Sequence, residues 1–159
     1  GHNVPMESPA KTLPEALAKM TCRPEPRPMG IVGWPEGGPD QVPFADLGAQ
    51  EGPFQVIREG GEWTVLVDWP TAQALSGAHP GANLAGPLTW IRFEMPMDWE
   101  LVGFLARVAE ALAQVGIPIG AVCGFSRDHV FVPTDRASEA FAALAGLGIQ
   151  IPRGDQGSA

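Results

Sequence analysis

The sequence is poor in positive charge. Its 159 residues include 10 Lys and Arg against 18 Asp and Glu, which gives a net charge of −8 and a pI of about 4.7. Nucleic-acid binding and attraction to an anionic membrane surface both require a surplus of positive charge. We therefore expect neither nucleic acid nor a membrane among the partners of this protein.

Long apolar runs and a cysteine framework are also missing. No run approaches the roughly 18 apolar residues of a membrane-spanning helix, and the opening residues 1–5 lack the basic head and apolar middle of a signal peptide. The two cysteines, Cys22 and Cys123, allow one disulfide at most. We expect a cytoplasmic protein in which both thiols are reduced.

Clustered catalytic or metal-binding residues are absent as well. Cys123, Asp128 and His129 have the side chains of a nucleophile system, but Cys123 falls in an apolar strand and no oxyanion donors are evident. Adding His79 gives no metal-ligand spacing. The glycines of residues 30–38 lack the Gly-Lys-Ser/Thr of a phosphate loop. We therefore predict no catalytic residues, no metal, no cofactor and no enzymatic activity.

The composition that remains is that of a folded protein, with 45% hydrophobic and 18% charged residues. Residues 1–20 suggest a flexible N-terminus with a short helix. Residues 21–76 form a first half with a β-hairpin, because strand formers at 54–58 and 63–67 flank a Gly-Gly turn. Residues 77–87, with three Gly and two Pro, are predicted to be a linker.

The second half is more regular. Apolar residues alternate from Thr89 to Met95, which indicates a strand, and then recur every three or four residues from Trp99 to Val115, which indicates a helix. Asp98 is a good N-cap for this helix and Gly116 a good residue just past its end.

The remaining segments complete a known pattern. Strands are predicted at 117–125 and 129–132, a helix at 135–147, and a last strand at 149–151, followed by a flexible tail at 153–159. The order over 88–152 is β-α-β-β-α-β, which predicts an α+β protein of the ferredoxin-like class.

Three motifs in this half carry a resemblance to a known family. They are Trp90-Ile91-Arg92-Phe93-Glu94 followed by Asp98-Trp99, then Ala113-Gln114-Val115-Gly116-Ile117-Pro118-Ile119, then Cys123-Gly124-Phe125-Ser126-Arg127-Asp128. Together they resemble the ACT modules of the arginine-sensor (CASTOR) and aspartate-kinase-like regulatory group. The resemblance implies a ferredoxin-like ACT module in residues 88–152. It also implies a degenerate ACT-like half, with the hairpin, in residues 21–76.

The resemblance also implies a function and a site. The protein would be an amino-acid-binding allosteric sensor, a homodimer whose ligand, a small amino acid or a related amine–carboxylate, binds at a module interface. The expected ligand-binding residues are Asp98, Trp99, Glu100, Leu101, Val102, Gly103, Gly124, Phe125, Ser126 and Asp128. Cys123, Gly124 and Arg127 depart from the family pattern, because they stand where it has hydroxyl side chains.

The expected site residues and the expected function also have simpler interpretations. Residues 98–103 fit an ordinary capped helix start, and Asp128 fits a hairpin residue that satisfies its own turn backbone. At the level of function, the alternatives are a dimerisation or assembly module that has lost its ligand, and an enzyme built on a ferredoxin-like fold. Fold alone would not establish the enzyme.

Overall fold

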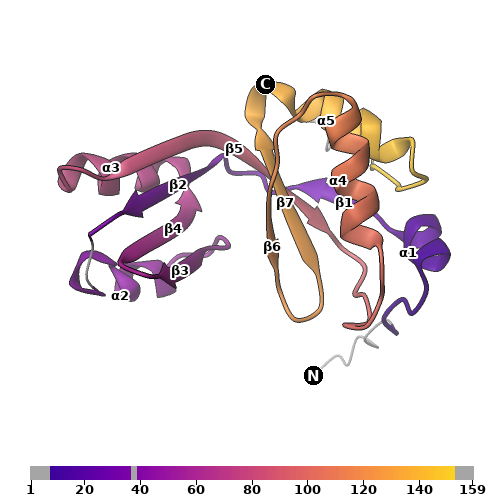
Figure 1. The fold of residues 1–159 in the computed structure, drawn as a ribbon, viewed down its shortest axis with the longest axis horizontal. Helices are drawn as coiled ribbons and strands as arrows, with labels where there is room; N and C mark the ends of the chain where they lie inside the picture. Colours follow the sequence, from indigo (N-terminus) through magenta and orange to yellow (C-terminus); the bar gives the residue numbers. More distant parts are fainter. Residues whose placement is uncertain (1–7, 37–38, 153–159) are drawn as a thin grey trace. The chain divides into compact units, whose positions relative to one another are not determined.

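The computed structural model describes residues 8–36 and 39–152 of the chain (Figure 1). The chain divides into two compact units. Unit 1 comprises residues 1–25 and 90–159, and unit 2 comprises residues 26–89. Strand β5 (Asn83–Phe93) contributes its first residues to unit 2 and its last residues to unit 1. The second unit is therefore an insertion between two segments of the first.

Unit 2 is a complete β-α-β-β-α-β module. Its elements are β2 (Met29–Trp34), the 3-10 turn η1 (Pro39–Gln41), α2 (Phe44–Gly48), β3 (Gln55–Glu59), β4 (Glu62–Asp68), α3 (Trp69–Ala78) and the start of β5. All pairings are antiparallel, and the strand order is β3-β4-β2-β5. The predicted hairpin is confirmed as β3 and β4.

The core of unit 2 lies between the sheet and its two helices. Its buried side chains are Val32, Trp34, Val42, Leu47, Val65, Val67 and Ala72. Helix α3 begins after Asp68 because the Asp68 carboxylate accepts a hydrogen bond from the Thr71 backbone amide at 3.1 Å. Gly30 and Gly86 let the backbone approach α3, since a Cβ at either would lie 2.7 Å from the Trp69 ring.

The predicted linker at residues 77–87 is wrong. Helix α3 runs to Ala78, and β5 pairs with β2 from Asn83 onward, in a register that sets Ala85 opposite Ile31. Of the Gly and Pro residues that indicated a linker, Gly77 lies in α3, and Pro80 and Gly81 lie in the turn before β5. Gly86 and Pro87 lie in β5, an edge strand of this unit, where proline is tolerated.

Unit 1 contains the second pair of helices that pack on a sheet, together with a short N-terminal helix. Its elements are α1 (Leu13–Lys19), β1 (Cys22–Pro24), the end of β5, α4 (Phe104–Gln114), β6 (Gly120–Cys123), β7 (Asp128–Pro133), the 3-10 turn η2 (Thr134–Arg136) and α5 (Ala137–Ala145). The strand order in this unit is β1-β5-β7-β6. Helices α4 and α5 pack on the sheet (Figure 1), and Ile91, Phe93, Val108, Leu112, Val130, Val132, Phe141 and Leu144 are buried between them.

The short helix expected within residues 1–20 is α1, but the described residues around it are not a loose terminus. Ala10, Ala16 and Met20 are fully buried in the core of unit 1, and β1 pairs with the end of β5. Residues 149–151, where a last strand was predicted, contain only one isolated bridge, between Gln150 and Thr21. Residues 1–7 and the tail predicted at 153–159 lie outside the described residues.

The start of α4 also differs from the prediction. Helix α4 begins at Phe104 rather than Trp99, because Gly103 has a φ of 98° and interrupts the helical backbone. Asp98 caps a local turn instead, accepting a hydrogen bond from the Glu100 amide at 2.9 Å. Gly116, with a φ of 72°, ends α4 as expected.

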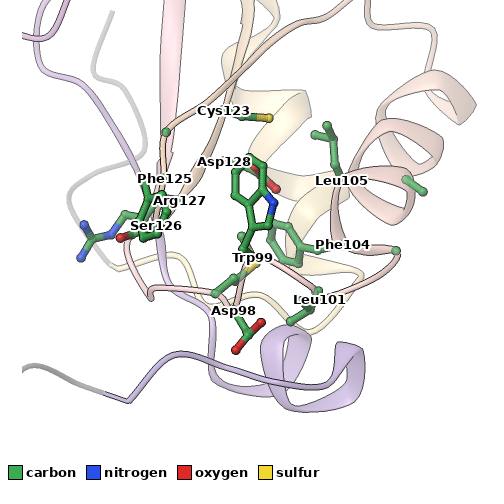
Figure 2. Close-up of a pocket in the computed structure, with 14 residues that line it drawn as sticks. Asp98, Trp99, Leu101, Phe104, Leu105, Cys123, Phe125, Ser126, Arg127 and Asp128 are labelled. Carbon is green, nitrogen blue, oxygen red and sulfur yellow. The ribbon is translucent and has the colours of Figure 1, made fainter.

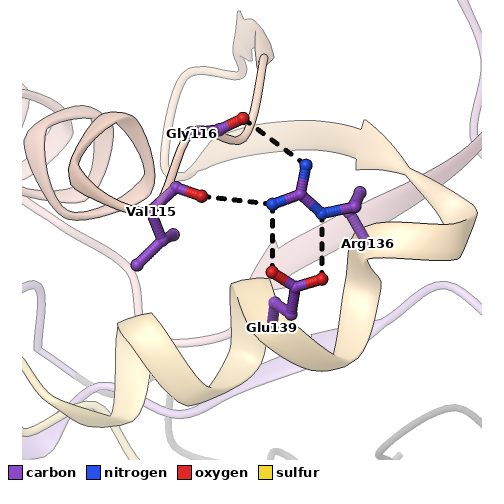
Figure 3. A network of polar contacts seen from close by, with 4 residues as sticks. All are labelled: Val115, Gly116, Arg136 and Glu139. Carbon is purple, nitrogen blue, oxygen red and sulfur yellow. Dashed lines mark hydrogen bonds and ion pairs between the residues drawn. The ribbon is translucent and has the colours of Figure 1, made fainter.

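An arginine joins the end of α4 to the start of α5 (Figure 3). Arg136 donates to the carbonyl oxygens of Val115 and Gly116 at 3.1 and 3.5 Å, and makes a bidentate pair with Glu139 at 2.9 and 3.0 Å. The carbonyl groups at a helix end lack partners within the helix, and a guanidinium suits both them and the dipole there. Arg136 therefore ties the two helices of unit 1 together.

Candidate functional site

A cavity of about 240 Å³ lies within unit 1, where the loop before α4 meets the β6–β7 turn (Figure 2). Its wall is built from three segments of the chain: the loop before α4, the first turn of α4, and the turn between β6 and β7. The lining residues are Met97, Asp98, Trp99, Leu101, Gly103, Phe104, Leu105, Ala106, Cys123, Gly124, Phe125, Ser126, Arg127 and Asp128. We call this cavity the unit 1 pocket.

The loop is held by the N-terminal segment. The Asp98 amide donates to the Ala10 carbonyl at 2.8 Å, and the Leu101 amide donates to the Asp98 carbonyl at 3.0 Å. A Cβ on Gly103 would lie 3.3 Å from the Leu13 side chain, and the positive φ of Gly103 favours glycine there. The segment expected to be flexible thus fixes one wall of the pocket.

The β6–β7 turn is attached to the residues that follow β5. The Met97 amide donates to the Ser126 carbonyl at 2.9 Å, and the Arg127 side chain donates through Nε to the Glu94 carbonyl at 2.9 Å. In Figure 2 the Arg127 guanidinium points away from the pocket. Arg127 therefore has a structural role here, and its positive charge is not directed at the cavity.

The N-terminus of α4 opens on the pocket. Phe104, Leu105 and Ala106 are its first three residues and line the cavity, and no side chain caps the helix. The first amides of a helix have no partner within it, and the helix dipole adds partial positive charge at this end. This wall can therefore bind a carboxylate or another small anion.

The opposite wall carries a carboxylate. Asp128 faces Cys123 across the hairpin, and Figure 2 shows its side chain on the pocket side of β7. Burial, a side-chain hydrogen bond with Asp128 and the negative charge of Asp128 all raise the pKa of the Cys123 thiol. The thiol is therefore protonated at neutral pH, and Asp128 supplies negative charge opposite the helix end.

Two aromatic rings stand beside the cavity. Trp99 and Phe125 stack nearly parallel, with centroids 6.2 Å apart and 12° between their planes. They are 70% and 87% exposed, and the neighbouring Val102 is 83% exposed. Such large apolar side chains are unusual on a surface when they gather in one place. We call Trp99, Val102 and Phe125 the apolar rim.

The nucleophile system considered from the sequence does not assemble. Asp128 pairs with Cys123 whereas His129 pairs with Val122, and successive side chains of a strand point to opposite faces. His129 instead lies edge-on to Trp90, with centroids 5.2 Å apart. Burial and the charges of Arg92 and Arg127 lower the pKa of His129, against an opposing effect of Asp128.

Eight of the ten expected site residues line the pocket. Glu100 and Val102 do not, since the helix on which they were expected to lie begins later. The residues that sequence reasoning missed are Met97, Phe104, Leu105, Ala106, Cys123 and Arg127. A glycine directly before an apolar helical pattern was the available clue to the true helix start, and it would have brought in Phe104, Leu105 and Ala106.

Some features can be excluded for residues 8–36 and 39–152. No three His, Cys, Asp or Glu side chains there are grouped to hold a metal ion. Both cysteines are free; Cys22 is buried and Cys123 is exposed. Within the same residues, every helix is too short or too polar to cross a membrane.

The fold and the pocket together define a ferredoxin-like α+β protein with a cavity beside the N-terminus of α4. Residues 87–146 match the family model described as ACT domain. No curated protein matches the sequence.

Solved structures of several proteins share the fold. One is a protein from Agobacterium tumefaciens, with a TM-score of 0.69, 16% identity, and coverage of 84% of this chain and 92% of that chain. A Vibrio cholerae protein of unknown function has a TM-score of 0.62 at 22% identity, covering 83% and 92%. The regulatory subunit of aspartate kinase from Thermus flavus has a TM-score of 0.60 at 16% identity, covering 80% and 96%. At these identities the likeness establishes the fold alone.

Proposed function

We propose that this chain is a regulatory protein of tandem ACT-like modules that senses a small amino acid in the unit 1 pocket. The observation that carries the proposal is the pairing of an uncapped helix end with Asp128 across one cavity. An amino acid has the complementary pair of charges. Its carboxylate would meet the amides of Phe104, Leu105 and Ala106, and its ammonium would meet Asp128.

The dimensions and surface of the pocket support a small ligand. A volume of about 240 Å³ lies below the roughly 300–1,000 Å³ of sites for drug-sized molecules. Met97, Leu101 and Leu105 give part of the wall an apolar character, which suits the side chain of an amino acid. We place the ligand's side chain there, beneath the Trp99 and Phe125 rings.

The mechanism we propose is allosteric. The ligand would join the loop at 98–103 to the turn at 124–128, and so favour the conformation in which both are in place. Couplings of this kind are typically about 1–3 kcal/mol. The proposal includes the tandem arrangement, with unit 1 as one ACT-like module and unit 2 as the other.

The test is thermal denaturation of the full chain with each natural amino acid at millimolar concentration. At 100 times its dissociation constant a ligand adds about 2.7 kcal/mol to the free energy of unfolding. For a chain of this size we expect the melting midpoint to rise by roughly 5–10 °C. The variant Asp128→Asn should lose this rise, because it removes the charge that faces the ammonium group.

The matched control is Asp135→Asn, which changes an exposed aspartate of η2 outside the pocket. It should keep the full rise. If no amino acid raises the midpoint, the sensor proposal fails, and the second candidate gains support. That candidate is an assembly module without a ligand, which the exposed apolar rim and the missing hydroxyls at Cys123 and Gly124 favour.

A further inference from the structure

One face of the unit 1 sheet carries an ionisable side chain that the proposed sensor site does not use. His129 of β7 pairs with Val122 of β6, and its ring lies edge-on to Trp90 of β5 with centroids 5.2 Å apart. Trp90 also meets Phe131 edge-on, with centroids 4.8 Å apart, and both of these residues are buried. The His129 ring is thus packed against a buried aromatic pair.

The same ring reaches the turn that forms one wall of the unit 1 pocket. A Cβ on Gly124 would lie 3.8 Å from the Nε2 atom of His129. The next residue, Phe125, stacks on Trp99, which lies in the loop before α4. The Gly124 amide donates to the Arg127 carbonyl at 2.8 Å and so closes the turn. A movement of the His129 ring would therefore be felt on both walls of the pocket.

The other nitrogen of the ring is shielded from water. Nδ1 of His129 is buried and has no hydrogen-bond partner among the described residues. A neutral imidazole can leave one nitrogen without a proton, whereas the imidazolium ion carries an N–H donor at both. A charged donor that is buried without an acceptor costs more than a bare nitrogen does. The packed position therefore suits the neutral ring.

The charges around the ring also oppose its protonation. Arg92 of β5 and Arg127 of the turn both disfavour a positive charge on the imidazole. Asp128 has the opposite effect, and Glu25 offsets part of the Arg92 charge through an ion pair at 3.3 Å. Strand β6, the other neighbour of β7, has no charged residue. Burial is the largest effect and, with the two arginines, lowers the pKa of His129 from the ordinary value of 6.5.

We propose that His129 is a pH-sensitive switch that controls the unit 1 pocket. While the imidazole is neutral, it stays packed against Trp90 and holds the turn at 124–128 in place. Once the imidazole takes up a proton, it turns Nδ1 toward water and leaves Trp90, and the stacking of Phe125 on Trp99 is lost with the position of the turn. The consequence for ligand binding rests on the proposed function, whereas the switch itself does not.

The direction of the pH effect follows from the two states of the chain. His129 has a lower pKa in the folded protein than in the unfolded chain, where the ordinary value of 6.5 applies. Above pH 6.5 the ring is neutral in both states, and the folded state has its full stability. As the pH falls from there through the folded pKa, the unfolded chain takes up the proton first and stability is lost. We therefore expect an intact pocket at neutral pH and a loosened one in acid.

The test follows the indole N–H signals of the full chain by proton–nitrogen NMR from about pH 8 to about pH 4.5. Trp90→Phe and Trp99→Phe assign two of the five tryptophan signals, and the ring protons of the histidines report their charge. We expect the Trp90 and Trp99 signals to move at the pH at which His129 takes up its proton, below 6.5. In His129→Phe, which keeps an aromatic ring but cannot ionise, neither signal should move at that pH.

His79 provides the matched control. It also lies edge-on to a buried tryptophan, Trp34, with centroids 5.6 Å apart, but in unit 2. His79→Phe should leave the titration of the Trp99 signal unchanged. A Trp99 signal that is constant in the parent, or that titrates alike in the parent and in His129→Phe, would overturn the switch. His129→Gln, which also cannot ionise, repeats the comparison if His129→Phe folds poorly.

A ligand measurement separates the switch from the sensor proposal. In the parent, the rise in melting midpoint with a stabilising amino acid should be smaller below the measured His129 midpoint than above it. In His129→Phe the rise should be the same at both pH values. An equal rise in the parent would overturn the control of the pocket by His129. If no natural amino acid raises the midpoint at either pH, the sensor proposal fails, and the indole titrations still decide whether the switch exists.

Discussion

At the scale of single residues, the pKa of the Cys123 thiol depends on the neighbouring Asp128 carboxylate. Burial, the hydrogen bond and the negative charge hold its pKa above the ordinary value, so the reactive thiolate is scarce near pH 8. Asp128→Asn removes the charge and should lower that pKa. We expect the rate of Cys123 modification by an aromatic disulfide reagent to rise at a fixed pH, and its pH profile to move to lower pH.

Cys22 provides the contrast in the same experiment. Burial, with a smaller effect of the Glu94 charge, raises the pKa of Cys22 to about 12. Cys22 should therefore remain unmodified while the protein is folded, and Cys123→Ser should remove the fast reaction. Asp135→Asn serves as the charge control. An unchanged Cys123 profile in Asp128→Asn would contradict the arrangement of the pocket wall.

Two glycines of unit 2 give opposite expectations for the same substitution. In Gly30→Ala the new methyl group would lie 2.7 Å from both the Trp69 ring and the Ala72 side chain. We expect this overpacking to lower the free energy of unfolding by about 1–3 kcal/mol. In Gly77→Ala the methyl group meets nothing within 4 Å inside α3, and we expect a gain of roughly 0.5–1 kcal/mol. Urea denaturation of the two variants measures both, and equal changes would contradict the packing of α3 on β2.

At the scale of elements, the Arg136 contacts join α4 to α5. Arg136→Ala removes hydrogen bonds to two carbonyl groups at the end of α4 as well as the pair with Glu139 (Figure 3). Glu139→Gln removes only the ion pair. Because all these groups are close to solvent, we expect a fall of only a few degrees in the melting midpoint for Arg136→Ala, and a smaller one for Glu139→Gln. The reverse order would show that the ion pair, and not the helix cap, is the important contact.

The helices and strands also show which parts of the fold could be predicted from the sequence. Short-range patterns located the hairpin of β3 and β4, the strand of β5, and the end of α4 at Gly116, because each depends on neighbours only a few residues apart. The start of α4 was misplaced because Leu101 fits the helical period although it lies in a loop. Asp98 is a residue type that favours helix N-caps, but its carboxylate accepts a hydrogen bond within a local turn instead.

Short-range sequence patterns could not predict the pairing of β1 with β5. Cys22 and Phe93 are partners far apart in the sequence, and nothing local distinguishes β1 from a Pro-rich connection. The burial of Ala10 under the pocket loop was missed for the same reason. Eight of the predicted residues nevertheless line the pocket, since the loop at 98–103 comes after β5 and the turn at 124–128 leads into β7, the antiparallel neighbour of β5.

At the scale of the whole molecule, each unit repeats one arrangement. In unit 2 the first strand is β2, and one cavity lies at its end. In unit 1 the last residues of β5 form the corresponding strand, and the loop after them leads to the unit 1 pocket. The two units therefore repeat one arrangement, in which a cavity lies near the end of a central strand.

The apolar rim of Trp99, Val102 and Phe125 leads to a proposal about assembly. We propose that it is covered by a second copy of the chain, since these three exposed apolar side chains would otherwise remain in water. Light scattering at tens of micromolar protein should then report twice the chain mass of 16.8 kDa. Val102→Lys should shift this value to the monomer, because a twofold contact would bring the introduced charges together. Val115→Lys, at another exposed valine of unit 1 outside the rim, should remain a dimer. A parent protein that is monomeric, or a dimer that both variants disrupt equally, would contradict this interface.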